Sequence, residues 1–125
     1  MKEPKAYVDS YQLTIHLFHR TKNFPKQLRP TLGRSIEEEA LKLTQNLRKT
    51  FVLPNKEENK LRKINYLQEA SLSLDDLKVL IQMSYDLKAI NVAALSETTT
   101  LTREIGKEIG GLLKHFKRGG NYDPT

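Results

Sequence analysis

The chain has 125 residues, with 21 lysines and arginines against 15 aspartates and glutamates, no cysteine, and a formal net charge of +6. This length fits one domain, and the absence of cysteine excludes disulfides, cysteine-ligated metal sites and thiol nucleophiles. The composition is typical of a reducing cytosol. Residues 1–9 are mostly polar, and no uncharged stretch approaches the ~18 residues of a membrane span. We therefore expect a cytoplasmic single-domain protein with no membrane partner.

The basic charge is concentrated at the two ends of the chain. Residues 1–35 hold seven lysines and arginines against two acids, residues 36–109 hold eleven against twelve, and residues 110–125 hold three against one. If the fold brings the two ends together, they form one basic face that attracts phosphate backbones or an acidic partner. A net charge of this size also keeps a small domain soluble, so both interpretations stay open at this point.

Four segments have helical periodicity, and they are separated at Asn23-Phe24-Pro25, Pro54-Asn55, Ile90-Asn91 and Gly119-Gly120. In each segment hydrophobic residues recur every three or four positions, which is the period of an α-helix. We predict helices over residues 5–22, 26–52, 56–87 and 92–117, followed by a flexible tail over residues 119–125. Short turns between four such helices favour an all-α fold, an antiparallel up-down-up-down four-helix bundle over residues 1–118.

The hydrophobic stripes predict the side chains of the core. The first stripe is Val8, Tyr11, Ile15 and Phe18, and the second is Leu28, Leu32, Ile36, Ala40, Leu43, Leu47 and Phe51. The third is Leu61, Ile64, Leu67, Ser71, Leu74, Leu77 and Ile81, with Tyr85 close to its end. The fourth is Leu95, Ile105, Ile109, Leu112 and Phe116.

The third segment permits two interpretations. Ser73 followed by Asp75 and Asp76 resembles the start of a helix, with a capping side chain and an acidic first turn. The small residues Ala70, Ser71 and Ser73 instead let a neighbouring helix approach a continuous helix closely. We favour one helix over residues 56–87.

No catalytic motif is present. The sequence lacks GxxxxGK[ST], GxSxG and HExxH, and it has no Glu-x-x-His pair of the kind that carboxylate-bridged bundles use to bind metal. His16 and His19 have a spacing that can direct two imidazoles toward one metal ion, but no cysteine and only one further histidine accompany them. The acidic runs Glu37–Glu39 and Asp75–Asp76 consist of consecutive residues, which point in different directions on a helix. We therefore predict no enzyme activity, cofactor or metal.

The candidate binding residues are basic side chains on the last three predicted helices. Arginine binds phosphate through a planar fork, so Arg34, Arg48 and Arg62 are the strongest candidates. Cations at the end of the fourth helix also have a structural explanation, because they stabilise a helix C-terminus. The complete candidate nucleic-acid-binding set is Lys26, Arg29, Arg34, Arg48, Lys49, Arg62, Lys63, Lys114, Lys117 and Arg118.

Four stretches of the chain resemble a known family. They are Asn23-Phe24-Pro25-Lys26, Leu32-Gly33-Arg34-Ser35-Ile36, Leu77 to Leu87 and Glu104 to Lys114. In these stretches the chain is similar to small four-helix-bundle proteins, which include the accessory variability determinant (Avd) of diversity-generating retroelements and the intervening-sequence proteins encoded within 23S ribosomal RNA genes. The intervening-sequence branch has an Asn-Ile-Ala-Glu-Gly type signature where this chain has Asn46-Leu47-Arg48-Lys49-Thr50, and the departure favours the Avd-like branch.

The resemblance implies a non-catalytic accessory protein. An Avd-like protein is expected to form a homopentamer that binds the retroelement reverse transcriptase and nucleic acid, either template RNA or cDNA, and so supports mutagenic retrohoming. Five copies would carry about +30 charges, and such multivalent contact gives affinity without a strong single site. The alternative within the superfamily is an RNA-associated bundle protein of the ribosomal RNA intervening-sequence type. A third possibility, of another class, is a structural bundle whose basic face binds an acidic protein.

Overall fold

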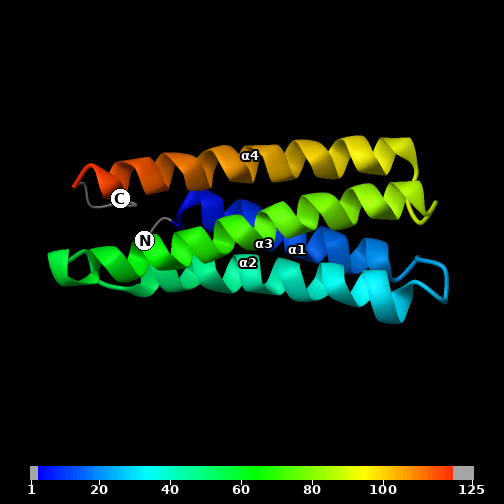
Figure 1. The fold of residues 1–125 in the computed structure, drawn as a ribbon, viewed down its shortest axis with the longest axis horizontal. Helices are drawn as coiled ribbons and strands as arrows, with labels where there is room; N and C mark the ends of the chain where they lie inside the picture. Colours follow the sequence, from blue (N-terminus) through cyan, green and yellow to red (C-terminus); the bar gives the residue numbers. More distant parts are fainter. Residues whose placement is uncertain (1–2, 120–125) are drawn as a thin grey trace.

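Four long helices make up most of the computed structural model, which describes residues 3–119 (Figure 1). The helices are α1 (Lys5–Thr21), α2 (Arg34–Val52), α3 (Lys60–Asp86) and α4 (Val92–Lys117). A π-helical turn, η1 (Arg29–Gly33), leads directly into α2, and a 3-10 turn, η2 (Glu57–Asn59), leads into α3. The predicted all-α fold is confirmed. Of the tail predicted over residues 119–125, all but Gly119 lies outside the described residues.

Successive helices run in opposite directions, as the colour gradient along the ribbon in Figure 1 shows. Each helix packs against its neighbours in the chain, and α1 also packs against α4. The starts of α1 and α3 therefore lie at the same end of the bundle as the final turns of α2 and α4. We call this the Phe116 end, after a buried residue of α4, and we call the opposite end the Phe24 end, after a buried residue of the turn that follows α1.

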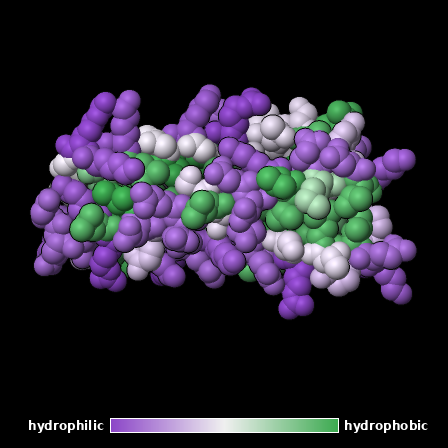
Figure 2. All heavy atoms as spheres, viewed as in Figure 1, coloured by the Kyte–Doolittle hydropathy of each residue, from purple (hydrophilic) through white to green (hydrophobic). Residues whose placement is uncertain are grey.

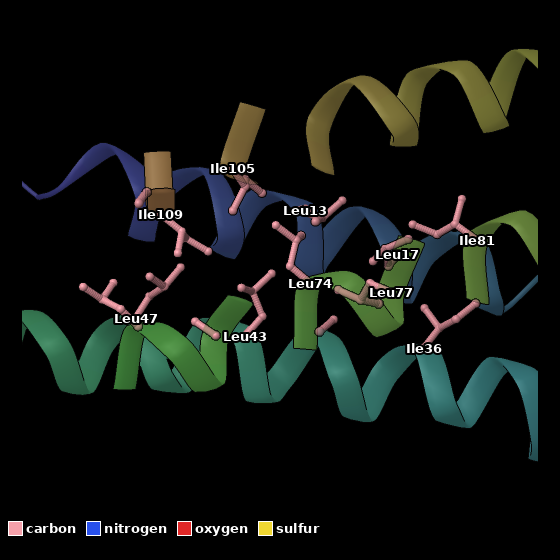
Figure 3. Packing of buried hydrophobic residues seen from close by; sticks show 14 of the residues in the cluster. Leu13, Leu17, Ile36, Leu43, Leu47, Leu74, Leu77, Ile81, Ile105 and Ile109 are labelled. Carbon is pink, nitrogen blue, oxygen red and sulfur yellow. The ribbon is translucent and has the colours of Figure 1, made fainter. Parts of the chain in front are cut away.

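The core contains buried hydrophobic side chains from all four helices (Figure 3). In α3 seven of the eight buried positions recur at alternating steps of four and three residues, which is the 3.5-residue period of helices packed in a left-handed bundle. These seven are Lys63, Leu67, Ala70, Leu74, Leu77, Ile81 and Ser84, and the eighth is Ser73. The stripe predicted for α2 is largely confirmed, because Leu32, Ile36, Ala40, Leu43 and Leu47 are all buried.

The stripe predicted for α1 is wrong. Tyr11 is 52% exposed, and the neighbouring stripe residue Ile15 is exposed as well. The buried residues are instead Ala6, Ser10, Leu13, Thr14, Leu17 and Thr21. Hydroxyl groups occupy these core positions at little cost because they form hydrogen bonds there: Thr14 Oγ1 donates to the Ala40 carbonyl at 3.1 Å.

Further hydroxyl bonds join α1 to α2. Thr44 Oγ1 donates to the Ser10 carbonyl at 3.1 Å, and it lies 2.9 Å from Thr14 Oγ1, whose own hydrogen is directed to the Ala40 carbonyl. Nearer the Phe24 end, Thr21 Oγ1 donates to Glu37 Oε2 at 2.6 Å. These bonds fix the longitudinal register of α1 against α2.

The third segment forms one continuous helix, as predicted. Ser73 is buried inside α3 and does not cap a second helix. The core positions predicted for Leu61 and Tyr85 are wrong, since Leu61 is 75% exposed and Tyr85 is also exposed. The buried position near the start of α3 belongs to Lys63, because the 3.5-residue repeat places that residue on the inner face.

The first half of α4 packs through small and polar residues. Asn91 caps the helix, and its Oδ1 accepts a hydrogen bond from the Ala94 N–H at 2.8 Å. Thr98 is buried, and its hydroxyl donates to the Ala94 carbonyl at 2.8 Å. α4 ends at Lys117, shortly before Gly119, whose φ of 89° is the left-handed conformation that often terminates a helix. Within residues 3–119, no helix combines the length and apolar character needed to cross a membrane.

Candidate nucleic-acid interface

The ten predicted basic residues do not form one face. Lys26, Arg29 and Arg34 lie around the start of α2, at the Phe24 end. The other seven lie at the Phe116 end: Arg48, Lys49, Arg62, Lys63, Lys114, Lys117 and Arg118. α3 has 27 residues and is therefore about 40 Å long, so the two groups are separated by almost the length of the bundle. The expected single basic face is not formed, although the start of α1 and the end of α4 do lie at the same end (Figure 1).

The prediction is wrong for Lys63, which is only 2% exposed. Its ammonium forms a hydrogen bond with Asn55 Oδ1 and lies 5.7 Å from the centroid of the Phe116 ring. Burial lowers the pKa of Lys63 below its ordinary value, because the charged form is poorly solvated there. A buried ammonium cannot reach a phosphate group, so Lys63 belongs to the core of the Phe116 end.

Arginines at the Phe24 end already have partners within the chain. Arg29 Nε donates to the Phe24 carbonyl at 3.0 Å, which holds the turn before η1. Arg34 Nε lies 3.3 Å from Glu38 Oε1, one turn further along α2. Lys26, in contrast, is exposed. These internal contacts leave the arginine forks at this end less available to a ligand.

Six cations at the Phe116 end are exposed and form no ion pair with any acidic side chain of residues 3–119. They are Arg48, Lys49, Arg62, Lys114, Lys117 and Arg118. Lys49 Nζ lies 5.8 Å from the centroid of the Tyr66 ring, which connects the cations of α2 and α3. We refer to these six residues as the basic cluster.

Two further lysines at this end are not among the predicted site residues. Lys56 is exposed in the turn before α3, and Lys60 Nζ donates to the Gly119 carbonyl at 3.2 Å, which brings the start of α3 close to the end of α4. Lys60 also pairs with Glu57 at 2.8 Å. Their spacing along the chain gave no signal, because only the fold brings residues 56–62 next to residues 114–119.

The helix dipole favours some cations of the basic cluster and opposes another. Lys114 and Lys117 lie in the last turn of α4, where a cation is favoured by the negative end of the helix dipole. Arg62 lies in the first turn of α3, where the same dipole opposes a cation. Local helix stability therefore does not explain Arg62.

A second charged group ties α1 to α4. Lys5 Nζ lies 2.6 Å from Asp9 Oδ2 and 3.0 Å from Glu108 Oε2. Burial raises the pKa of Glu108, and the adjacent Asp9 carboxyl raises it further. Hydrogen bonds to both carboxylates raise the pKa of Lys5. Glu108 Oε1 is buried and has no hydrogen-bond partner among the described residues. This arrangement is a structural contact between helices, because its cation is already shared by two acids.

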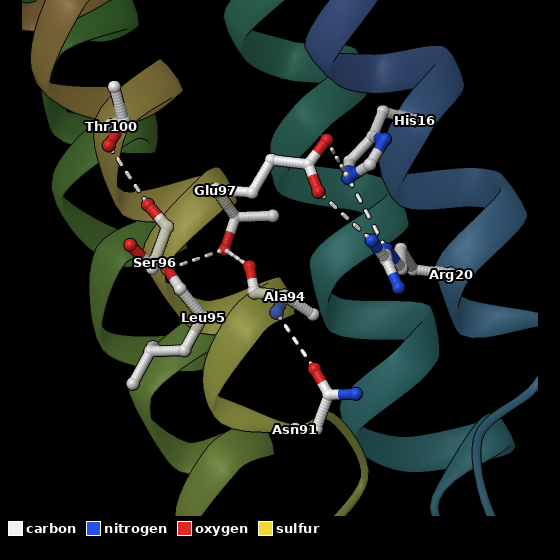
Figure 4. Close-up of polar contacts among 9 residues, drawn as sticks. His16, Arg20, Asn91, Ala94, Leu95, Ser96, Glu97 and Thr100 are labelled. Atoms are coloured by element: carbon white, nitrogen blue, oxygen red, sulfur yellow. Dashed lines mark hydrogen bonds and ion pairs between the residues drawn. The ribbon is translucent and has the colours of Figure 1, made fainter.

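His16 takes part in a third contact, between α1 and α4 (Figure 4). Arg20 Nη2 donates to Glu97 Oε2 at 3.1 Å, and Arg20 Nε lies 3.4 Å from His16 Nε2. Glu97 Oε1 lies 4.0 Å from the same imidazole nitrogen. His19 is exposed on the neighbouring surface. Within residues 3–119, no three histidine, aspartate or glutamate side chains are grouped in a way that could hold a metal ion.

The basic cluster is thus the strongest candidate site for a ligand. The chain matches no protein-family model, and a comparison with curated proteins finds no relative. The six exposed cations can bind an extended polyanion by neutralising its phosphates and releasing counterions.

Proposed function

We propose that this chain is a non-catalytic nucleic-acid-binding protein that serves the reverse transcriptase of a diversity-generating retroelement. Its part is to bind template RNA or cDNA while the polymerase carries out mutagenic retrohoming in the cytoplasm. The basic cluster supports the nucleic-acid part of this proposal. The resemblance to Avd-like proteins supports the polymerase part.

The observation that carries the nucleic-acid proposal is that the basic cluster has no acidic partners among residues 3–119. A cation that is already paired gains little from a phosphate, because the contact must replace an existing ion pair. Lys114, Lys117 and Arg118 are exposed and have no such pair among the described residues. Several copies of the chain on one nucleic acid would increase the affinity through multivalent contact.

The experiment is a salt titration of binding to a fluorescently labelled single-stranded RNA. The variant combines Lys114→Glu, Lys117→Glu and Arg118→Glu, and fluorescence anisotropy measures affinity between about 50 and 200 mM salt. Each lost phosphate contact should reduce the slope of log affinity against log salt by ~0.7, so we expect a reduction of about 2.

The matched control makes the same charge change at the Phe24 end, with Lys22→Glu, Lys26→Glu and Arg34→Glu. We expect this control to change the slope by less, since Arg34 is already paired with Glu38, whereas all three cations changed at the Phe116 end have no ion pair among the described residues. Equal losses in the two variants would show that only net charge matters, and would remove the basic cluster as a site.

The polymerase part is tested by co-elution with a reverse transcriptase from the same genome. We expect the two proteins to elute together and the paired complex to retain RNA. The alternative, an RNA-associated protein of the ribosomal intervening-sequence type, predicts binding to a 23S ribosomal RNA fragment and no co-elution with the polymerase.

A further inference from the structure

A cleft lies between α3 and α4, near the middle of the bundle. It has a volume of about 300 Å³, and its lining includes Lys78 and Ile81 of α3 and Leu95, Thr99 and Arg103 of α4. None of the six residues of the basic cluster lines it. Figure 2 shows hydrophilic side chains along the edge of the molecule that α4 occupies in Figure 1, whereas hydrophobic side chains gather over α2 and α3 at the Phe24 end.

Short side chains of α4 leave room for this cleft. Thr99 and Thr102 both line it. Thr102 is buried, and its hydroxyl donates to the Thr99 carbonyl at 3.0 Å, so its polar group is satisfied inside the helix. Thr99 is exposed, so burial does not explain a β-branched residue of low helix propensity at this position. Its hydroxyl can donate a hydrogen bond to a ligand in the cleft.

Two cations from different helices border the same space. Lys78 and Arg103 line the cleft, and no acidic side chain of residues 3–119 lines it with them. Lys78 Nζ reaches across to α4, where it lies 3.6 Å from the position that a Cβ of Gly106 would occupy. Gly106 follows Arg103 by three residues and therefore lies on the same side of α4. The ammonium and the guanidinium thus approach the cleft from its two walls.

Neither cation is hydrogen-bonded to an acid of the described chain. Arg103 is exposed and forms no ion pair within residues 3–119. Lys78 Nζ lies 4.0 Å from Asp75 Oδ1, which exceeds the length of an N–H···O hydrogen bond, about 2.7–3.2 Å. An exposed pair at such a distance contributes little. Both side chains keep their donors available to an anion.

We propose that this cleft binds the phosphate group of a nucleotide. Arg103 supplies a planar fork that matches two phosphate oxygens, Lys78 supplies a second positive charge, and Thr99 supplies a hydroxyl donor. Ile81 and Leu95 provide apolar surface for the attached base. The volume of about 300 Å³ is at the lower end of the range for small-molecule sites, so it suits one nucleotide.

The cleft can serve the nucleic acid that the basic cluster binds, and in this respect the inference rests on the proposed function. Arg103 and Lys114 are eleven residues apart on α4, or about 16 Å. A stacked strand advances ~3.4 Å per nucleotide, so about five nucleotides span this distance. Each chain contains a complete cleft, which is compatible with an assembly of five copies and leaves the basic cluster uncovered. A free nucleotide presents the same phosphate chemistry, and the test separates the two sources.

The first measurement is the salt titration of binding to labelled single-stranded RNA, with a variant that combines Lys78→Gln and Arg103→Gln. Loss of two phosphate contacts should reduce the slope by about 1.4, at ~0.7 for each contact. The control combines Lys22→Gln and Lys26→Gln, which removes two exposed cations that form no ion pair within residues 3–119. Because the control has the same net charge, it should keep a slope close to that of the unmodified chain. Circular dichroism checks that both variants retain their helices.

The second measurement is an NMR titration of the full chain with uridine monophosphate, read at the backbone amides of Gln82 and Thr99. Uridine, which lacks the phosphate, is the control ligand. Shifts that uridine monophosphate produces, that uridine does not produce and that the Lys78→Gln, Arg103→Gln variant loses would identify a free nucleotide as a source. The predicted loss of slope without such shifts would identify a nucleotide within a strand.

The inference is overturned if the cleft variant loses no more slope than its control and uridine monophosphate causes no phosphate-dependent shift. RNA binding that depends on Lys114, Lys117 and Arg118 would then still support the proposed function. In the opposite case, an unmodified chain that binds no RNA but shows the phosphate-dependent shifts would contradict the proposed function and support the cleft. The two failures therefore give different results.

Discussion

The two ends of the bundle use their charges differently. At the Phe24 end, Arg20 and Arg34 pair with glutamates of the same chain, while apolar side chains remain exposed in the groove between α2 and α3. At the Phe116 end, the apolar core is closed by Phe116, while the basic cluster has no acidic partner among residues 3–119. Lys22 and Lys26 at the Phe24 end are also exposed and form no ion pair among these residues. The two ends therefore differ in how many of their cations lack an ion pair.

The largest effect on stability is expected for a substitution in the hydrophobic core, which extends between the two ends. Leu43 is fully buried near the middle of α2, and Leu43→Ala should lower the free energy of unfolding by about 2–5 kcal/mol, since it removes buried methyl groups and leaves a cavity. Denaturant titration followed by circular dichroism measures this. The control Leu41→Ala changes an exposed neighbour and should stay within about 0.5 kcal/mol. If amide signals from the two ends were lost at different denaturant concentrations, the ends would be independent units.

The next effect on stability is expected at Lys63, which is buried next to Phe116. Lys63→Met keeps the length of the side chain and removes a buried ammonium whose charged form is poorly solvated, so we expect stability at neutral pH to rise. The matched control, Arg62→Met, changes an exposed neighbour and should have little effect on stability. A loss of stability in Lys63→Met would mean that the bond to Asn55 and the contact with Phe116 outweigh the cost of burial.

The lowered pKa of Lys63 also predicts a dependence on pH. The native state binds this proton less readily than the unfolded chain, whose lysines titrate near 10.5. The penalty is fully present below the lowered native pKa and disappears as pH rises toward the unfolded value. The difference in free energy of unfolding between Lys63→Met and the unmodified chain should therefore decrease from neutral to alkaline pH.

A smaller effect is expected at the start of α4, close to the groove at the Phe24 end. Asn91→Ala removes the side-chain acceptor for the Ala94 N–H and should cost about 1 kcal/mol. Asn91→Asp keeps an acceptor at the cap and should retain most of the stability. Thermal unfolding compares the two variants. Equal losses in both would show that the amide of Asn91 acts through another contact.

The smallest effect is expected where α1 meets α4 near the Phe116 end. The raised pKa of Glu108 means that the native state binds this proton more readily than the unfolded chain, whose glutamates titrate near 4.5. That contribution is present below the unfolded value and is lost as pH rises through the raised native pKa. Glu108→Gln removes it, so stability should depend less on pH across the weakly acidic range. Glu104→Gln, an exposed change on the same helix, should leave the pH dependence unaltered.

The start and end of α4 and the ends of α1 and α2 could be predicted because proline, glycine and asparagine act locally. The predicted start of the second helix at residue 26 was wrong, since residues 29–33 form a π-helical turn and α2 begins at Arg34. Asn91 caps α4 and Gly119 follows its end, and both effects depend only on the residues beside them. The stripe of α2 was also predictable, since its buried residues are nearly all leucine, isoleucine or alanine. In α1 the same reasoning failed, because Thr14 is buried with its hydroxyl bonded to the backbone of another helix.

The candidate site was less predictable than the fold. Lys63 looked like its neighbour Arg62 in the sequence, and only the 3.5-residue repeat of α3 places it inside. The sequence also gave no sign that Arg29 is bonded inside the chain, because its partner is a backbone carbonyl in the turn before η1. Long-range proximity, such as that of Lys60 to Gly119, depends on topology and has no local signal.

The hydrogen bonds of the buried hydroxyl groups differ from helix to helix. This difference predicts which helix separates from the bundle more readily. The buried threonines of α4 bond to carbonyls of α4 itself, as Thr98 does to Ala94 and Thr102 does to Thr99. The hydroxyls between α1 and α2 instead cross from one helix to the other. When α4 separates, its threonine bonds remain satisfied, whereas separating α1 from α2 breaks bonds that only the pair provides. Native-state amide exchange should therefore be faster along the first half of α4 than along the facing stretches of α1 and α2.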